Sequence, residues 1–151
     1  MTCTNEGKIS QKIVPFTECK ATTTAFSNAM DKDEGIFRAP EDGAYEVTFT
    51  GHLKSYGGNR VWATLYKLDE NDTDKENPNI EGASFVGMTL ERSSNKEAKV
   101  SADLSASTTL VTIENLKKGE KLCMGLGRWN PRNFIQGDPV MKTVHFTVRR
   151  I

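Results

Sequence analysis

The stretch from Gly35 to Gly51 reads GIFRAPEDGAYEVTFTG and holds two predicted strands with a turn between them. Ile36 and Phe37 predict a short extended run that ends at Pro40, because proline has no amide hydrogen to donate to a strand ladder. The acidic pair and glycine that follow supply turn chemistry. From Ala44 onward apolar and polar residues alternate, which predicts a strand with one buried face.

Short apolar or β-branched runs separated by turn signals fill the rest of the chain, and no helical period lasts for three turns. We expect further strands over residues 12–16, 60–68, 83–90, 100–104, 110–113, 122–126 and 144–151. The pattern predicts an all-β protein, an antiparallel two-sheet sandwich. Residues 1–11 are polar and predict a disordered N-terminal lead or stalk remnant, followed by one domain over residues 12–151.

Three segments together resemble a known family. The first is the pattern Gly-x-Phe-x-x-Pro-x-x-Gly-x-Tyr-x-x-x-Phe, which starts at Gly35 and ends at Phe49. It resembles the globular head domain of complement C1q, in the superfamily that includes tumour necrosis factor. Residues 116–122 and 144–151 resemble the turn and the closing strand of that family. Val148 stands where the family usually has glycine, and Glu120 where it has aspartate.

The resemblance implies a jelly roll of about ten strands and a trimer assembled around aromatic strands. Residues 60–68 are apolar on both alternating sets, yet a sandwich strand needs only one buried face. Another subunit, or a loop of the same chain, would therefore cover the second set. We expect four aromatic side chains to support the core and subunit packing. They are Phe49, Trp62, Tyr66 and Phe146.

Two loops are candidates for ligand contact. The loop over residues 127–139 places aromatic residues beside arginines, a composition typical of protein interfaces. Alternatively, Trp129 and Phe134 plug the end of the sandwich. The acidic loop over residues 69–81 could hold calcium or be an ordinary charged surface, and it contains a glycosylation triplet at Asn71. We expect protein or glycan ligands to contact four residues of these loops. They are Arg128, Trp129, Arg132 and Asp72.

Charge and hydropathy narrow the class of partner. Twenty basic and twenty acidic side chains give a formal net charge of zero. This balance argues against a nucleic-acid partner, which favours a basic surface. No apolar run reaches the about 18 to 20 residues of a membrane helix, so we expect no membrane insertion.

Three cysteines leave one outside any intramolecular pair. Cys123 alternates with apolar neighbours and predicts a packed core residue. Cys3 and Cys19 either form a disulfide or leave Cys3 unpaired or linked to another chain. No secretory signal is recognisable at the N-terminus, so we expect a leader to have been removed if the protein is secreted.

Catalytic and cofactor motifs are missing from the sequence. His52 and His145 belong to no metal-binding spacing, and no phosphate-binding glycine pattern is complete. We therefore expect no enzyme and no cofactor, with calcium as the alternative.

The main hypothesis is a secreted homotrimer that binds ligands with avidity, and the resemblance implies a role in innate immunity. Alternatives are an intracellular interaction domain like that of the caprin proteins, a cytokine-like receptor ligand and a structural shell.

Overall fold

The structure is a computed structural model that describes residues 1–55, 62–68, 84–88, 104–126, 133–141 and 143–151. The described strands form two antiparallel sheets. The first sheet contains β1 (Thr2–Thr4), β2 (Lys8–Ile9), β3 (Glu18–Lys20), β6 (Gly43–Ser55), β9 (Leu104–Leu116), β11 (Asn133–Gln136) and β12 (His145–Arg150). The second contains β4 (Met30–Asp31), β5 (Ile36–Arg38), β7 (Ala63–Leu68), β8 (Ser84–Met88) and β10 (Lys121–Leu126). A 3-10 turn, η1, spans Thr24–Phe26.

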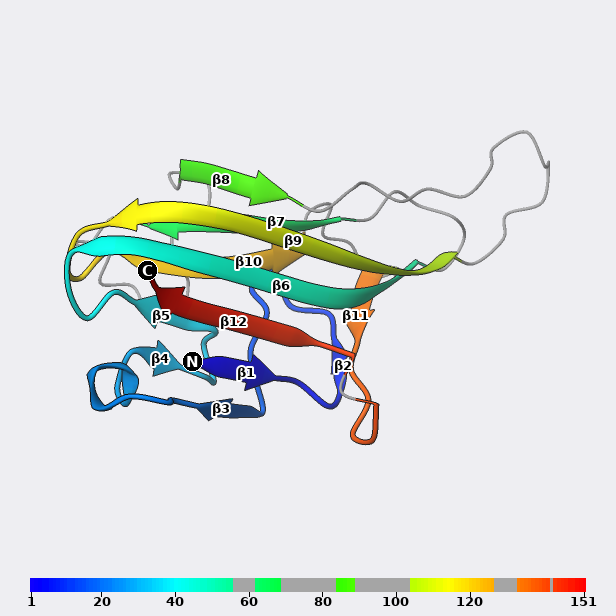
Figure 1. The fold of residues 1–151 in the computed structure, drawn as a ribbon. Helices are drawn as coiled ribbons and strands as arrows, with labels where there is room; N and C mark the ends of the chain where they lie inside the picture. Colours follow the sequence, from blue (N-terminus) through cyan, green and yellow to red (C-terminus); the bar gives the residue numbers. More distant parts are fainter. Residues whose placement is uncertain (56–61, 69–83, 89–103, 127–132, 142) are drawn as a thin grey trace.

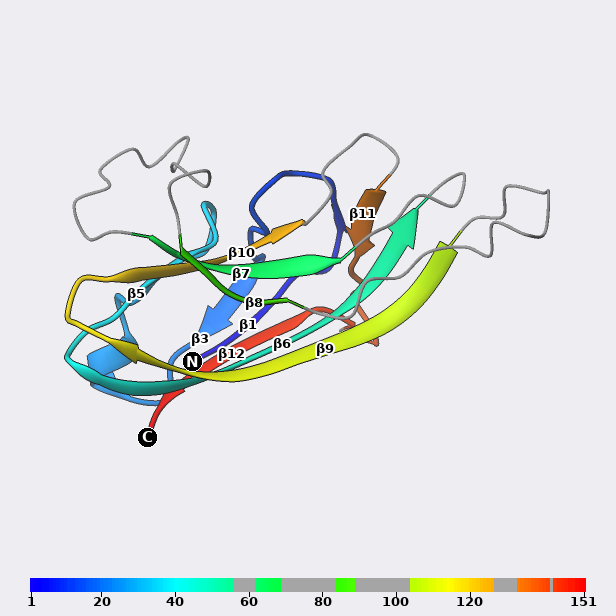
Figure 2. The same ribbon diagram turned by 90° about the horizontal axis from the view of Figure 1, so that it is seen from above.

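The chain passes repeatedly from one sheet to the other. The order in the first sheet is β2-β11-β6-β12-β1-β3, with β9 paired to the other side of β6. The order in the second sheet is β4-β5-β10-β7-β8. Figure 1 shows the first sheet in front of the second, and Figure 2 shows the two layers from above. These features confirm the predicted jelly-roll sandwich, with twelve strands in the described part of the chain where about ten were expected.

An aromatic cluster joins the two sheets at the motif that starts at Gly35. The Phe37 ring lies 6.0 Å from the Phe26 ring and 5.9 Å from the Tyr45 ring, centroid to centroid. Phe37 and Tyr45 are fully buried. The Tyr45 hydroxyl donates a 2.6 Å hydrogen bond to the Glu41 carbonyl oxygen, so the turn before β6 satisfies the one polar atom of that side chain.

Glycine is required at position 35. Its φ is +72°, in the left-handed region, and an added Cβ would overlap the carbonyl oxygen of Val14. The close approach lets the segment before β3 lie against the second sheet, where the Val14 amide donates a 2.8 Å hydrogen bond to the Met124 carbonyl. The motif glycine therefore fixes a contact between distant segments as well as a turn.

Strand β6 is longer than the alternation predicted. The predicted stretch ends at Gly51, whereas β6 continues through Gly51 to Ser55. An added Cβ at Gly51 would lie 2.9 Å from two atoms of the Phe49 ring, so the glycine makes room for that ring. The extension is paired on both sides, with β9 along its whole length and with β11 near Ser55.

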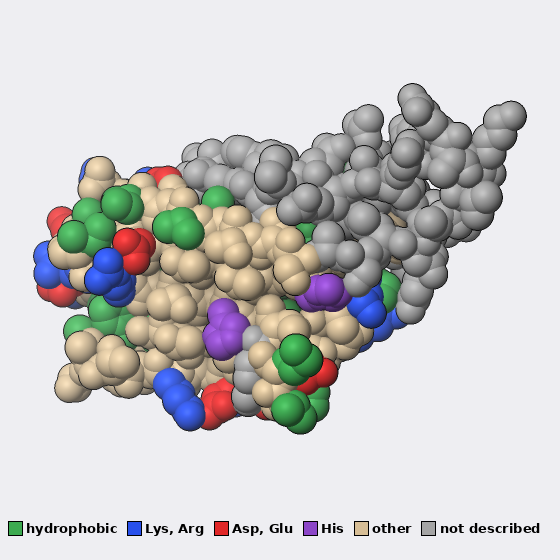
Figure 3. Space-filling model, turned by 45° about the vertical axis from the view of Figure 1, so that its right-hand side comes forward, with side chains coloured by type: hydrophobic (Ala, Val, Ile, Leu, Met, Phe, Trp, Pro, Cys, Tyr) green, Lys and Arg blue, Asp and Glu red, His purple; other side chains and the backbone are tan. Residues whose placement is uncertain are grey.

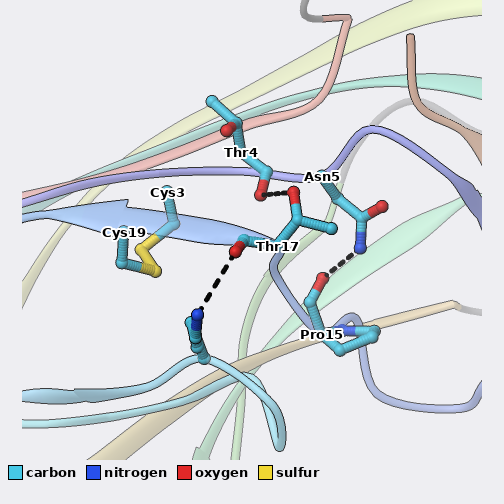
Figure 4. The surroundings of a disulfide bond; sticks show 7 residues. Cys3, Thr4, Asn5, Pro15, Thr17 and Cys19 are labelled. Atoms are coloured by element: carbon cyan, nitrogen blue, oxygen red, sulfur yellow. Dashed lines mark hydrogen bonds between the residues drawn. A yellow bond between two sulfur atoms is a disulfide. The ribbon is translucent and has the colours of Figure 1, made fainter. Parts of the chain in front are cut away.

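The prediction that residues 1–11 form a disordered lead is also wrong. Strand β1 lies between β12 and β3, and Cys3 is fully buried in the core. The Cys3–Cys19 disulfide joins directly opposite residues of β1 and β3 (Figure 4). Nearby, the Asn5 side chain donates a hydrogen bond to the Pro15 carbonyl. The first twenty residues are thus part of the sandwich. Strand β1 pairs with β12 and β2 pairs with β11, and both partners are distant in sequence.

Candidate functional site

The strands of the first sheet form a regular outer surface. Its centre consists of two rows that cross β9, β6, β12 and β1, and we call it the threonine face. One row contains Val111, Thr48, Thr147 and Thr2, and the next contains Thr109, Thr50, His145 and Thr4. Each of these side chains is half-buried or exposed. Figure 3 shows this side of the molecule.

The local sequence dictates which side chains reach this face. In β6 the side chains of Tyr45, Val47 and Phe49 enter the core, so the residues between them point outward. The same alternation holds in β12, where Phe146 and Val148 are buried. The hydroxyls of Thr50 and Thr109 lie 3.3 Å apart across the β6–β9 pair. A polar surface with mostly short side chains results.

Charge is confined to the margins of the threonine face. Neither central row contains a charged residue before edge strand β3, although 26% of the chain is charged. At one end Arg149 holds Glu46 through hydrogen bonds of 2.8 and 3.2 Å. These bonds keep the pKa of the Glu46 carboxyl below its ordinary value. On β3, Lys20 pairs with Glu18 at 3.3 Å. The two central rows therefore contain no Asp, Glu, Lys or Arg side chain on β9, β6, β12 and β1.

Two apolar side chains of β9 project on this face, Val111 at the end of one row and Ile113 in the position opposite Glu46. Val111 is 62% exposed and Ile113 is 58% exposed. They lie on the edge strand of the sheet, directly opposite Thr48 and Glu46 of β6. Exposed apolar side chains that lie side by side mark a candidate site of protein–protein contact. The threonine face and this apolar edge together form our candidate binding surface.

The predicted subunit-packing residues occupy a different part of the fold. Phe49 and Phe146 are 0% and 1% exposed within a single chain, so they are core residues with no surface left for a second subunit. The Phe146 ring stacks on the Phe16 ring at 5.5 Å. Their burial agrees with the core part of the prediction, because the aromatic positions of β6 and β12 face inward. A part of Phe49 and Phe146 in subunit packing stays a prediction.

Trp62 and Tyr66 lie on or beside β7 in the second sheet and are half-buried. The Tyr66 ring packs over Gly125, where an added Cβ would lie 2.7 Å from Tyr66 Cε2. Thr64 and Leu68, on the same side of β7, are each 1% exposed. Cover from the same chain, the second of the two alternatives, therefore accounts for much of this surface. A role of Trp62 and Tyr66 in subunit packing stays a prediction.

The predicted ligand-contact residues Arg128, Trp129, Arg132 and Asp72 lie outside the described residues, as does Asn71. Phe134 of the same loop is described, and it is 2% exposed, with Lys8 Nζ 4.4 Å from its ring centroid. This agrees with the alternative that Phe134 packs against the sandwich. Further along, Asp138 Oδ1 accepts hydrogen bonds from the Val140 and Met141 amides and holds a turn.

No constellation typical of a catalytic or metal site occurs among the residues that the structure places. The described part of the chain contains no group of three or more His, Cys, Asp or Glu side chains able to hold a metal ion. Cys123 is buried in the second sheet, whereas His52 and His145 lie on the outer surface of the first. The sandwich therefore separates the buried thiol from both imidazoles. Among the described residues, no helix is long and apolar enough to cross a membrane.

Sequence reasoning missed the threonine face. The signal was present in the polar half of each alternating strand, where threonine, serine and histidine replace the lysine and glutamate common on solvated strands. Recognising it requires the register that sets Thr48 beside Thr147 and Val111. The sequence instead predicted subunit packing at β7, because that strand contains aromatic residues.

Comparison with known proteins gives structural neighbours only. No protein-family model matches the sequence, and no curated protein sequence matches it. The structure is similar to the globular domain of the zebrafish complement 1qA protein, with a TM-score of 0.62 and 16% identity over 99% of this chain and 94% of that one. It is also similar to the Eiger TNF of S. frugiperda, with a TM-score of 0.65 and 15% identity over 100% of this chain and 92% of that one. The chain therefore shares the jelly-roll fold of these two proteins.

Proposed function

We propose that the protein is a non-enzymatic recognition module that forms a homotrimer and binds protein or glycan ligands with avidity. The observation that carries this proposal is the threonine face, whose central rows contain no Asp, Glu, Lys or Arg side chain on β9, β6, β12 and β1, with the exposed Val111 and Ile113 at its edge. Protein interfaces are depleted of charged residues at their core. A second copy of the chain is the partner that we assign to this surface.

The geometry suits a closed ring of identical subunits. The surface combines a polar sheet face with exposed apolar side chains on an edge strand, so the edge of one copy can pack on the face of the next. Such a contact uses two different patches and closes into a ring when the rotation between copies permits it. A trimer then presents three copies of any loop site, which raises the effective concentration of weak contacts.

The Cys3–Cys19 disulfide supports secretion in preference to the cytoplasmic alternative. Disulfides persist in oxidising compartments and are rare where thiols are kept reduced. This bond lies between paired strands of the sandwich and contributes to the fold itself. We accordingly propose an extracellular module.

On the basis of the sequence, we propose that the ligand contacts Arg128, Trp129, Arg132 and Asp72. Aromatic and arginine side chains provide a large share of the binding energy at interfaces, which supports this choice. No metal or cofactor is part of the proposal.

Sedimentation velocity of the wild-type protein and of Thr48→Arg tests the self-association. We expect the wild type to sediment as a trimer at micromolar concentration and Thr48→Arg as a folded monomer. Thr48 lies at the centre of the face, between Val111 and Thr147, so three copies of the variant would bury three uncompensated charges. Circular dichroism of both proteins should show the same β-sheet content.

Thr22→Arg provides the matched control, because Thr22 is exposed and lies outside the strands. The same chemical change at that position should leave the trimer intact. A wild type that remains monomeric at tens of micromolar would remove both the trimer and the argument from avidity.

A further inference from the structure

Strand β9 is the longest edge strand in the described part of the chain. It has 13 residues and, among the described strands, pairs with β6 alone. The other edge strands of the two described sheets have five residues or fewer. Figure 1 shows β9, in yellow, at the margin of the first sheet. One side of a long strand is therefore left without a described partner strand.

Hydrogen bonds on the neighbouring strand show which backbone groups of β9 point outward. The Ile151 amide donates a 2.9 Å hydrogen bond to the Ala44 carbonyl oxygen, so Ala44 of β6 faces β12. In an antiparallel ladder, hydrogen-bonded pairs alternate with pairs whose backbone groups point away from each other. The next residue of β6 therefore faces β9, where it is opposite Glu114. Glu114 thus bonds to β6, whereas the amide and carbonyl groups of Ile113 face away from it, as do those of Val111.

The edge of β9 lacks the features that normally keep an edge strand from pairing. Residues 107–116 read STTLVTIENL, with no lysine, arginine or proline and with Glu114 as the one carboxylate. Natural proteins protect their edges with lysine, proline or very short strands. Strand β3, at the opposite edge of the first sheet, has three residues, of which Glu18 and Lys20 are charged. Unlike β3, β9 therefore offers a long edge that a partner can approach, beside the exposed side chains of Val111 and Ile113.

We propose that β9 of one copy docks on the threonine face of the next copy, where threonine hydroxyls form hydrogen bonds with the outward amide and carbonyl groups of β9. The inference rests on the proposed self-association and names the contacts that hold it together. A backbone group that leaves water without a hydrogen-bond partner is costly. A hydroxyl can donate to a carbonyl and accept from an amide, so one residue type serves both groups of the strand edge.

The threonines at the centre of the face suit this contact. Thr48 of β6 and Thr147 of β12 are directly opposite each other and half-buried. Their side chains are short and uncharged, so the backbone of a docking strand can come within hydrogen-bond distance of the hydroxyls. The methyl groups of the same residues can pack against the Val111 and Ile113 side chains of that strand. The threonine face thus complements both the backbone and the side chains of the β9 edge.

Sedimentation equilibrium of the wild type and of the double variant Thr48→Val and Thr147→Val tests the hydroxyl contacts. Valine keeps the branched shape of threonine and removes the hydroxyl. We expect the concentration at half-dissociation to rise about tenfold, because amide and carbonyl groups of β9 lose their partners. An association held by apolar contacts alone would change in the opposite direction, since valine adds apolar surface. Thr22→Val, at an exposed position outside the strands, is the matched control and should associate like the wild type.

Val111→Pro tests the edge of β9 itself. It removes an amide that points away from β6, so the pairing of β9 with β6 keeps its hydrogen bonds. We expect circular dichroism to show a folded protein, and sedimentation to show a monomer at the micromolar concentrations where the wild type is a trimer. Thr112→Pro, one position along, removes an amide that bonds to β6 and should instead lower the unfolding temperature.

Three outcomes count against the proposal in different ways. A wild-type trimer whose double valine variant associates as tightly or more tightly would overturn the hydroxyl contacts and leave the trimer in place. A folded Val111→Pro variant that remains a trimer would show that the edge of β9 is not the docking segment. A wild type that is monomeric in every measurement would contradict the proposed function and this inference with it.

Discussion

We expect Phe37→Ala to lower the free energy of unfolding by about 4 kcal/mol, within the range for removing a buried phenylalanine. The Phe37 side chain is fully buried and lies against the rings of Phe26 and Tyr45. Alanine would leave a cavity between the two sheets and remove both ring contacts. Urea denaturation followed by circular dichroism measures the change. Since native domains are stable by about 5–15 kcal/mol, the variant should unfold at a much lower urea concentration.

Two variants control this measurement. Val140→Ala removes an apolar side chain that is 86% exposed, so it should change the free energy of unfolding by about 0.5 kcal/mol or less. Phe37→Leu should lose less than Phe37→Ala, because it keeps part of the buried volume. All proteins are compared at one protein concentration, since association shifts apparent stability. A loss below about 1 kcal/mol for Phe37→Ala would contradict the placement of this ring at the centre of the core.

The elements that the sequence predicted well are those in which alternation and burial coincide. Tyr45, Val47 and Phe49 alternate with polar residues and enter the core from β6, and Phe146 and Val148 do the same from β12. The turn at Gly119, where φ is +90°, separates β9 from β10 as expected. In these strands the alternation in the sequence and the burial in the sandwich both require apolar residues at the same positions.

The N-terminal region was misjudged because its stability comes from distant partners. Thr2 is directly opposite Thr147, and Lys8 is opposite Gln136, so neither pairing leaves a local signal. Strands of two or three residues are too short for a periodic pattern to be distinguished from a polar tail. Likewise, the expected strand over residues 12–16 is replaced by an isolated bridge between Ile13 and Gly125.

The candidate surface could not be predicted from the sequence either, because it too depends on pairing between distant strands. The sequence indicated that one side of the segment around Trp62 needed cover, but the structure buries Thr64 and Leu68 of that side within one chain. The threonine face could not be predicted, because a threonine on a strand is ordinary until the register places several of them side by side. Interfaces of this kind become visible only with sheet topology.

Loss of the Cys3–Cys19 disulfide is the other change from which we expect a large effect. The bond spans a sequence separation of 16 residues, for which loop-closure entropy predicts about 3 kcal/mol. The closed segment contains β2, which pairs with β11 in the first sheet, and Ile13, which bridges to Gly125 in the second. Opening the loop therefore loosens a segment that joins both sheets, so the double variant Cys3→Ala and Cys19→Ala should unfold roughly 6–12 °C below the wild type.

Reduction of the wild type provides the comparison that isolates the bond from the packing of its sulfur atoms. Thermal unfolding of the wild type should shift downward with a thiol reductant, whereas the double alanine variant should not respond. Cys123 is buried and present in both proteins, so any effect of the reductant on that thiol cancels. An equal response of the two proteins to reductant would show that the pairing of β1 with β3 does not depend on the disulfide. In that case the argument for an oxidising compartment would lose its structural support.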